Sequence, residues 1–324
     1  KDLGLEVNHS NLCSEITLAT NSERTAVCCL SSVNLEEYDE WKNNKDFIPD
    51  LIRMLDNVIT YFCDTAPPEL WKAVNSAKAE RSLGLGAMGF HAYLQRHDIP
   101  FESAMAKSRN IKMFKHIKGE AKDATEKLAE ERGACPDGSS ANVRNAHLLA
   151  VAPNASSSII CGNTSPSIEP YRANAFTQKT KSGSSLLKNE YLEHALQEMD
   201  QDTDEVWKSI ITNGGSVQHL DFLDEWKKEV FKTAVEIDQR WVIEMAADRQ
   251  EEICQSQSLN IFFPSNVSKQ ELHAIHMMAW KKKVKTLYYL RSEAMKRAEN
   301  VSDEVLRQYI FDSIDDEGCL ACEG

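Results

Sequence analysis

The sequence predicts an α/β fold with a mostly parallel sheet. Segments with apolar residues at three- and four-residue spacing read as amphipathic helices, and short apolar or β-branched runs lie between them. The runs that predict strands are 148–151, 258–263 and 284–290. Strands that alternate with helices usually pair in parallel, because each crossover helix returns the chain to the same end of the sheet.

Two long helices are predicted in the first half of the chain. Residues 46–63 carry apolar residues at helical spacing, and Pro49 falls in the first turn, where proline is tolerated. Residues 103–132 place an apolar stripe on one face of a highly charged segment, and Gly133 follows as a helix stop.

Helical patterns return in the second half. Residues 221–251 contain one, and Thr233 with Glu236 has the form of a capping box that opens its second part. Ser268 and Glu271 repeat this signature before a helix over 272–283.

Composition excludes several classes of protein. The 324 residues are 42% hydrophobic and 27% charged, as in an ordinary globular protein. Lys plus Arg total 37 against 50 Asp plus Glu, a net charge of -13 that disfavours a nucleic acid polymer as partner. The densest basic cluster, 281–285, ends a predicted helix, where it complements the helix dipole. The sequence has no apolar run of membrane-spanning length and no signal-like start, so we expect a cytoplasmic protein without a membrane partner.

The nine cysteines favour free or redox-active thiols, because an odd number spread irregularly does not form a disulfide framework. Only Cys319 and Cys322 stand at zinc-ligand spacing, and no second pair accompanies them, so no metal site is predicted. Cys63, Cys135 and Cys254 are interpreted as small buried residues.

Residues 139–172 are rich in Ser, Asn, Pro and Gly and predict a functional loop around a strand. Within them, PNASSS at 153–158 offers consecutive hydroxyls and loop amides that could bind phosphate without a lysine. At the other end of the chain, residues 312–324 are acidic and poor in apolar residues, which predicts a mobile tail.

Gly84, Gly86 and Gly89 match the dinucleotide-binding fingerprint letter for letter. That fingerprint needs a hydrophobic strand before its first glycine, whereas residues 73–82 are polar and helical in character. We therefore interpret the glycines as sites of close helix packing and reject a nicotinamide cofactor.

A thiol lies between an amide and a carboxylate at Asn11, Cys13 and Glu15, and in an extended or looped backbone these side chains project the same way. A thiol beside a potential general base could act on a substrate hydroxyl, although spacing alone also fits a chance arrangement in a loop. Cys28 and Cys29 follow, and two strands joined by a turn would bring them back beside Cys13.

Two further pairs stand near the end of the chain. Tyr288 and Tyr289 are adjacent, and a strand would send one ring to each face, with core packing as the simpler interpretation. Cys319 and Cys322 form a dithiol on the predicted tail, where they could exchange with an internal disulfide and then with an external reductant.

Together these motifs resemble the large subunit of class I ribonucleotide reductase, from about Asn8 to the last residue. The residues Asn11, Leu12, Cys13, Ser14 and Glu15 read NLCSE and match the family motif N-L-C-x-E. The resemblance implies that Cys13 carries a transient thiyl radical and abstracts the ribose 3′ hydrogen. It implies that Glu15 is the base on the 3′ hydroxyl and that Asn11 hydrogen-bonds the substrate.

The other motifs match in turn. Cys28 stands at the position of the family's reducing cysteine, and Cys29 is a bystander. Tyr288 and Tyr289 match the stacked tyrosine pair of the family's radical relay. Cys319 and Cys322 match the dithiol of the family's C-terminal tail. In the family the phosphate loop is followed later by I-E-P, which matches residues 168–170 here, although Ser167 stands where glycine is common. The loop itself comprises Pro153, Asn154, Ala155, Ser156 and Ser157.

The resemblance implies the second half of the ten-stranded α/β barrel of these subunits, with a finger loop that carries Cys13. Residues 1–311 would be the C-terminal half of the catalytic barrel and 312–324 a mobile redox tail. The implied reaction is the thiyl-radical reduction of ribonucleoside diphosphates to deoxyribonucleotides for DNA synthesis. The family chain is more than twice as long, so the N-terminal half and the partner thiol of Cys28 are expected elsewhere.

The implied partners are that N-terminal half, a small subunit, and thioredoxin or glutaredoxin, within a larger oligomer. No cofactor is expected on this chain, because the radical comes from the metal-containing small subunit. Two alternatives stay open: an inert regulatory or assembly subunit, which the intact motifs disfavour, and a thiol-disulfide oxidoreductase that uses the tail thiols, which lack a supporting βαβ pattern.

Overall fold

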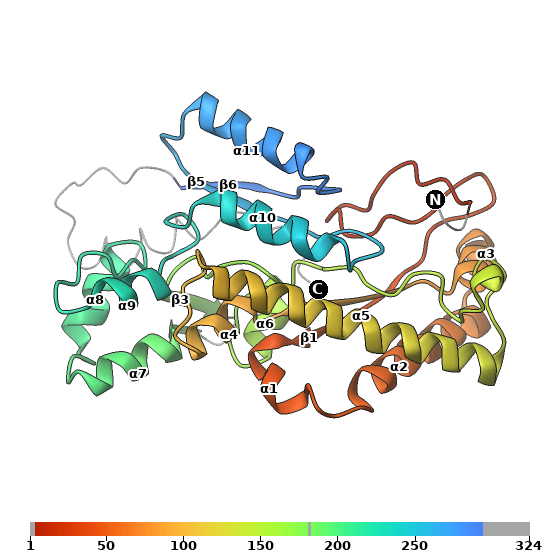
Figure 1. Cartoon of the computed structure of the whole chain (residues 1–324), viewed down its shortest axis with the longest axis horizontal. Coiled ribbons are helices and arrows are strands. Elements are labelled where there is room, and N and C mark those ends of the chain that lie inside the picture. Colours follow the sequence, from red (N-terminus) through yellow and green to blue (C-terminus); the bar gives the residue numbers. More distant parts are fainter. Residues whose placement is uncertain (1–3, 181–182, 294–324) are drawn as a thin grey trace.

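The computed structural model describes residues 4–180 and 183–293, and a parallel sheet runs through it (Figure 1). Strand β1 (Cys29–Asn34) pairs in parallel with β2 (Leu83–Met88), and β5 (Ile261–Pro264) pairs in parallel with β6 (Leu290–Glu293). Isolated parallel bridges, Leu85 with Leu149 and Val151 with Gln257, connect the two pairs. The extended segments therefore follow one another across the sheet in sequence order, as in one half of a barrel.

The three predicted strands are only partly regular. Residues 148–151 make isolated bridges, β5 begins at Ile261 instead of Ser258, and β6 begins only at Leu290. One reason is visible at Tyr289, whose backbone N–H donates to the side chain of Asn260 (2.9 Å) and not to a strand carbonyl. Side chains here replace some of the backbone hydrogen bonds between strands, and the apolar pattern of a sequence cannot reveal this.

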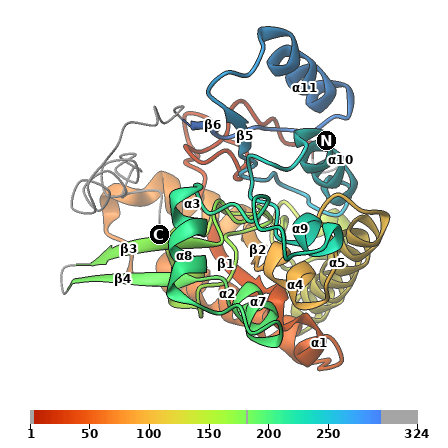
Figure 2. The same cartoon turned by 90° about the vertical axis from the view of Figure 1, so that its left-hand side faces the viewer.

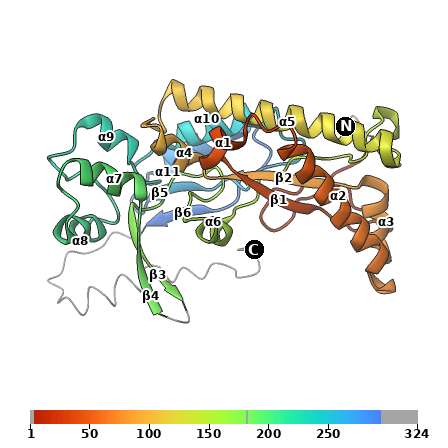
Figure 3. The same cartoon turned by 90° about the horizontal axis from the view of Figure 1, so that it is seen from below.

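Both long predicted helices are confirmed. Helix α2 (Phe47–Thr65) and helix α5 (Ala104–Arg132) pack against one another along the outside of the sheet (Figures 1 and 3). The Ser103 hydroxyl caps α5 by accepting from the Ala106 N–H at 3.1 Å, and Gly133 ends it at φ +84°. The apolar stripe of α5 is buried, so the helix is amphipathic as expected.

The two capping signatures have different outcomes. Helix α11 (Lys269–Lys281) is capped as predicted, because the Ser268 hydroxyl accepts from the Glu271 N–H at 3.0 Å. The prediction at Thr233 is wrong: α10 (Gln239–Gln250) begins after Asp238, whose carboxylate accepts from the Arg240 N–H at 2.9 Å. The Thr233 hydroxyl instead donates to the Glu236 carboxylate within a turn (2.9 Å).

Several further helical elements are short. They are η1 (Leu35–Glu37), α1 (Tyr38–Trp41), η2 (Pro68–Leu70), α3 (Trp71–Glu80), α4 (Phe90–Arg96), η3 (Ser139–Ala141) and α6 (Ala155–Ile160). None of the described helices is long and apolar enough to cross a membrane.

A second hydrophobic core, which the sequence did not indicate, lies at one end of the molecule (Figures 1 and 2). It is built from α7 (Glu190–Glu198), α8 (Asp204–Thr212), α9 (Glu225–Val230) and the hairpin of β3 (Ala175–Thr180) with β4 (Gly183–Lys188). The hairpin is antiparallel and projects from the body in Figure 2. The predicted helical region 221–251 is thus divided, with α9 in this core and α10 in the main one.

The glycine motif lies on a strand, so its interpretation as close helix packing is wrong. Gly84 and Gly86 belong to β2, which is buried along its whole length, and Gly89 precedes α4 at φ +79°. A Cβ added to Gly86 would lie 2.6 Å from the carbonyl oxygen of Ala150. The glycines let a neighbouring strand approach closely.

The three cysteines predicted to be buried differ from one another. Cys135 is buried, Cys63 is half-buried, and Cys254 is exposed, contrary to the prediction. The Cys254 sulfur accepts from the N–H groups of Leu148 (3.1 Å) and Leu149 (3.3 Å), so polar contacts hold it at the surface.

Candidate active site

The loop that carries Cys13 is fixed against the chain segment 255–258. The Ser256 N–H donates to the Glu15 carbonyl (2.9 Å), and the Ser258 hydroxyl donates to the Cys13 carbonyl (2.5 Å) and the Glu15 carboxylate (3.0 Å). Ser14 turns the loop at φ +67°. Cys13 and Glu15 are consequently both buried, although no pair of regular strands connects Cys13 to Cys28 as predicted.

Cys13 contacts the tyrosine pair. Its sulfur lies 3.5 Å from the hydroxyl oxygen of Tyr288, and the ring centroids of Tyr288 and Tyr289 are 4.0 Å apart. The two rings do not point to opposite faces as a strand would require, because both residues precede β6 in irregular backbone. Burial, together with hydrogen bonds to Cys13 and Tyr289, raises the pKa of the Tyr288 phenol, so it stays protonated.

Cys28 lies directly before β1, with its sulfur 3.4 Å from the side-chain nitrogen of Gln255. Burial raises the pKa of its thiol to about 12, and the Gln255 hydrogen bond partly offsets this. A Cβ on Gly84 would lie 2.9 Å from the Cys28 sulfur, so the first glycine of the motif makes room for this thiol. Burial also raises the pKa of the neighbouring Cys29.

Asn11 lies differently from its two motif partners. Asn11 and Leu12 are exposed, whereas Cys13 and Glu15 are buried. The Asn11 side-chain oxygen accepts from the Ile16 N–H at 3.0 Å, which closes the turn. The expected common direction of the three side chains is therefore not seen.

The predicted phosphate loop leads into helix α6. Asn154 adopts φ +53° before that helix, and its carboxamide donates to Ser32 of β1 (2.9 Å) and to the carbonyl of Ala87 in β2 (3.3 Å). Pro153 is buried, while Ala155, Ser156 and Ser157 are half-buried at the start of α6. Asn154 thus anchors to the sheet a turn whose hydroxyls and helix-start amides can meet an anion.

The I-E-P segment contains a buried acid. The Glu169 carboxylate accepts from the Asn260 side chain at 2.6 Å, and burial raises its pKa to about 7. The same Asn260 accepts from the Tyr289 N–H, so it connects Glu169 to the tyrosine pair. Ser167 adopts φ +51°, a conformation that favours glycine.

Gln255, Ser258 and Asn260 were not predicted as site residues. Each is fully or almost fully buried and directs its polar group at a motif residue. The available signal was the polar run QSQS at 255–258, which is unusual between a helix and an apolar strand. Cys319 and Cys322 lie outside the described residues. Among residues 4–180 and 183–293, no group of three or more His, Cys, Asp or Glu could hold a metal ion.

A family model described as "Ribonucleotide reductase, barrel domain" matches residues 3–142 and 137–290. The chain belongs to the ribonucleotide reductase family. It is 52% identical over 294 residues to the ribonucleoside-diphosphate reductase large subunit of Invertebrate iridescent virus 6, covering 90% of this chain and 31% of that protein. It is 48% identical to the putative large subunit of Frog virus 3, covering 100% of this chain and 57% of that protein.

A solved structure has the same fold. The chain superposes on the Actinobacillus ureae class Id ribonucleotide reductase alpha subunit with a TM-score of 0.84 and 38% identity, covering 94% of this chain and 56% of that one. The predicted α/β class and its place in the reductase barrel are confirmed. The chain spans between about a third and just over half of the length of these relatives.

Proposed function

We propose that this chain supplies the radical half of the active site of a ribonucleoside-diphosphate reductase. The observation that carries the proposal is the 3.5 Å contact between the Cys13 sulfur and the Tyr288 hydroxyl, with the tilted Tyr289 ring 4.0 Å from the Tyr288 ring, centroid to centroid. A protonated phenol beside a thiol suits transfer of a hydrogen atom, because electron and proton move together over one short contact.

The chemistry then follows from the positions of the side chains. A Tyr288 phenoxyl radical takes the hydrogen atom of the Cys13 thiol, which restores the phenol and leaves a thiyl radical. The thiyl radical abstracts the 3′ hydrogen of the ribose, and Glu15, buried beside Cys13, takes the proton of the 3′ hydroxyl. The 2′ hydroxyl takes a proton from a thiol of the Cys28 pair and leaves as water.

Cys28 has the second role in the proposal. With a second thiol it donates two electrons and two hydrogens in total, so that ribonucleotide and dithiol become deoxyribonucleotide, disulfide and water. At the end the 3′ carbon radical takes the hydrogen atom back from Cys13, and the Cys13 thiyl radical that results takes a hydrogen atom from Tyr288. The Cys319 and Cys322 pair would then reduce the disulfide and pass the electrons on to thioredoxin or glutaredoxin.

Substrate and partners complete the proposal. The hydroxyls and amides of Ser156 and Ser157 would bind the diphosphate, in a loop that Asn154 anchors. Asn11 would contact the ribose from its exposed turn. The radical would reach Tyr289 from a metal-containing small subunit, and the N-terminal part of the large subunit would supply the second thiol, in the cytoplasm and within a larger oligomer.

The test uses the full-length large subunit that contains this chain, assayed with its small subunit for deoxynucleotide. Cys13→Ser and Tyr288→Phe should each lower turnover by about three orders of magnitude or more, because neither new side chain can carry the radical. Both substitutions change volume little, so substrate binding should survive. Tyr38→Phe is the matched control: its buried hydroxyl bonds to His116 (3.1 Å) on another part of the molecule. Normal turnover in Cys13→Ser or Tyr288→Phe would contradict the proposal.

A further inference from the structure

Gln255 is a fully buried amide beside the Cys28 thiol of the proposed site. Its side-chain nitrogen donates to the Cys28 sulfur (3.4 Å) and to the carbonyl of Leu83 in β2 (2.9 Å). Its side-chain oxygen accepts from the N–H of Thr17 at 3.2 Å. A primary amide has two N–H donors and one oxygen, and here all of them are used.

These three bonds connect parts of the chain that are far apart in sequence. Thr17 lies two residues after Glu15, in the loop that Ser256 and Ser258 fix. Leu83 begins β2, and Cys28 leads into β1. One side chain therefore fixes the distance between the Cys13 loop, the sheet and the Cys28 sulfur.

We propose that Gln255 is a positioning residue that holds Cys28 toward the Cys13 loop and favours its reduced form. The inference rests on the proposed function, in which Cys28 alternates between thiol and disulfide. A thiol sulfur bears more negative charge than a disulfide sulfur and is the better acceptor of the Gln255 N–H. The bond also forms in an enclosed site, where an amide without its partner is costly.

The chain offers a matched control in Gln257. It is equally buried and lies in the same segment, but its side chain donates to the carbonyl of Ala246 (2.9 Å) and to Gln250 (3.3 Å) and accepts from Arg249 (3.5 Å), all on helix α10. Gln257→Met therefore removes the same chemical group from the same chain segment, and its side chain contacts neither Cys28 nor the Cys13 loop. Any effect of losing a buried amide as such should occur in both variants.

The experiment places Gln255→Met and Gln257→Met in the full-length large subunit. The thiol-disulfide equilibrium of Cys28 with its partner thiol is measured in defined redox buffers, by mass mapping of alkylated peptides. Gln255→Met should shift it about fivefold toward the disulfide, the factor expected for one net hydrogen bond. Gln257→Met should leave it unchanged, and Gln255→Leu should repeat the shift if Met alters packing.

Three results separate the inference from the function on which it rests. An unchanged equilibrium in both Gln255 variants would overturn the role of Gln255 and leave the function intact. Equal shifts in the Gln255 and Gln257 variants would also overturn it, since the effect would then be general loosening. Failure of Cys28 to form any internal disulfide in the parent enzyme would overturn the proposed function and the inference together.

Discussion

At the scale of single residues, Glu169 is a buried acid with a strongly raised pKa. It is 4% exposed, and its hydrogen bond to Asn260 connects it to the backbone of Tyr289. Burial raises its pKa from 4.5 to about 7, while Arg172 and Arg291 act in the opposite direction. Below about pH 7 the protonated form is therefore favoured in the folded protein.

The sign of the pH dependence follows from this shift. Between about pH 4.5 and 7 the folded state keeps a proton that the unfolded state has lost, so stability falls as the pH rises. The contribution of Glu169 is complete below about pH 4.5 and lost above about pH 7, and it amounts to roughly 2–4 kcal/mol.

Glu169→Gln should remove this pH dependence, because an amide does not titrate. The thermal midpoints of parent and variant are compared from pH 5 to pH 8 in the full-length subunit. The parent should lose stability relative to the variant as the pH rises. A difference that stays constant across the range would contradict the assignment.

The family resemblance predicted the motif residues as the site, but the sequence did not indicate the residues that support them. Residues that contact one another in the site stand far apart in sequence, as do Cys13 and Tyr288, and Cys28 and Gly84. Only the family resemblance could predict that the first two act together. Gln255, Ser258 and Asn260 carry no motif of their own. Their importance depends on what lies within hydrogen-bond distance, which a tertiary fold decides.

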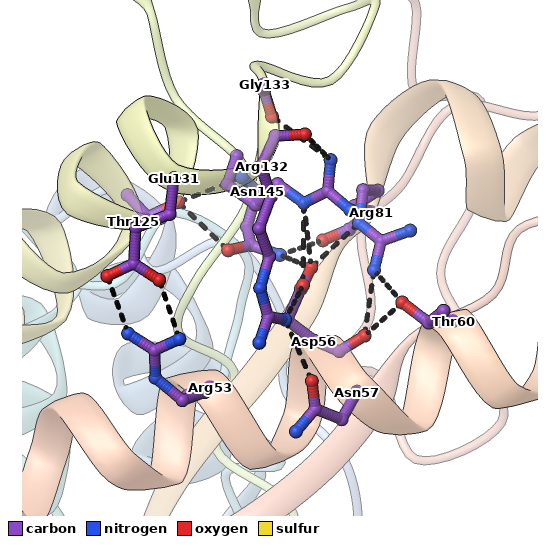
Figure 4. Close-up of polar contacts among 11 residues, drawn as sticks. Arg53, Asp56, Asn57, Thr60, Arg81, Thr125, Glu131, Arg132, Gly133 and Asn145 are labelled. Carbon is purple, nitrogen blue, oxygen red and sulfur yellow. Dashed lines mark hydrogen bonds and ion pairs between the residues drawn. The ribbon is translucent and has the colours of Figure 1, made fainter.

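At the scale of secondary structure elements, Asp56 lies at the centre of the polar contacts between α2 and α5 (Figure 4). Its fully buried carboxylate accepts from Arg81 (2.7 Å), Arg132 (2.9 Å) and Asn145 (3.0 Å), and Arg144 approaches to 3.4 Å. Burial opposes ionisation, but the hydrogen bond and charge of Arg81, with the charge of Arg144, outweigh it and lower the pKa of Asp56. One charge thus joins α2 to the end of α3, the end of α5 and the loop that follows.

Asp56→Asn should destabilise the protein by about 3–5 kcal/mol, because it leaves the buried guanidinium group of Arg81, and the less buried ones of Arg132 and Arg144, without a counter-charge. Glu131→Gln is the control: Glu131 also connects α5 to α2 through Arg53 (2.7 and 2.8 Å), but this pair is exposed, so little change is expected. Unfolding in urea measures both. A similar effect of the two substitutions would contradict a special role for the buried carboxylate.

Helices were easier to predict than strands. The periodic pattern of α2 and α5 repeats over many turns, and glycine or a serine cap marks an end. Strand β2 was missed, because its alternating glycines resemble a turn motif and it is buried on both faces. The second core was missed since its helices are short and its hairpin is antiparallel in a chain of otherwise parallel pairs.

At the scale of the whole molecule, the described part of the sheet has two open edges. In the described part of the chain β1 pairs only with β2, and β6 pairs only with β5. Leu30 on β1 and Leu290 on β6 are both 43% exposed. Open strand edges with apolar side chains are usually covered in soluble proteins, by pairing or by another segment.

We therefore expect the N-terminal part of the large subunit to cover these edges and complete the barrel. Such an interface should be obligate in character, burying more than roughly 2,000 Å². The chain alone, mixed with small subunit, substrate and dithiol, should give no turnover, and addition of the N-terminal part should restore it.

Leu30→Glu should weaken this complementation, because it places a charge in the covered edge. Phe222→Glu, at a residue 40% exposed outside the sheet, should not weaken it. Light scattering of the mixture measures assembly, and deoxynucleotide yield measures activity. Repeated turnover by the isolated chain would show that its open edges need no partner and would refute the half-barrel interpretation of the site.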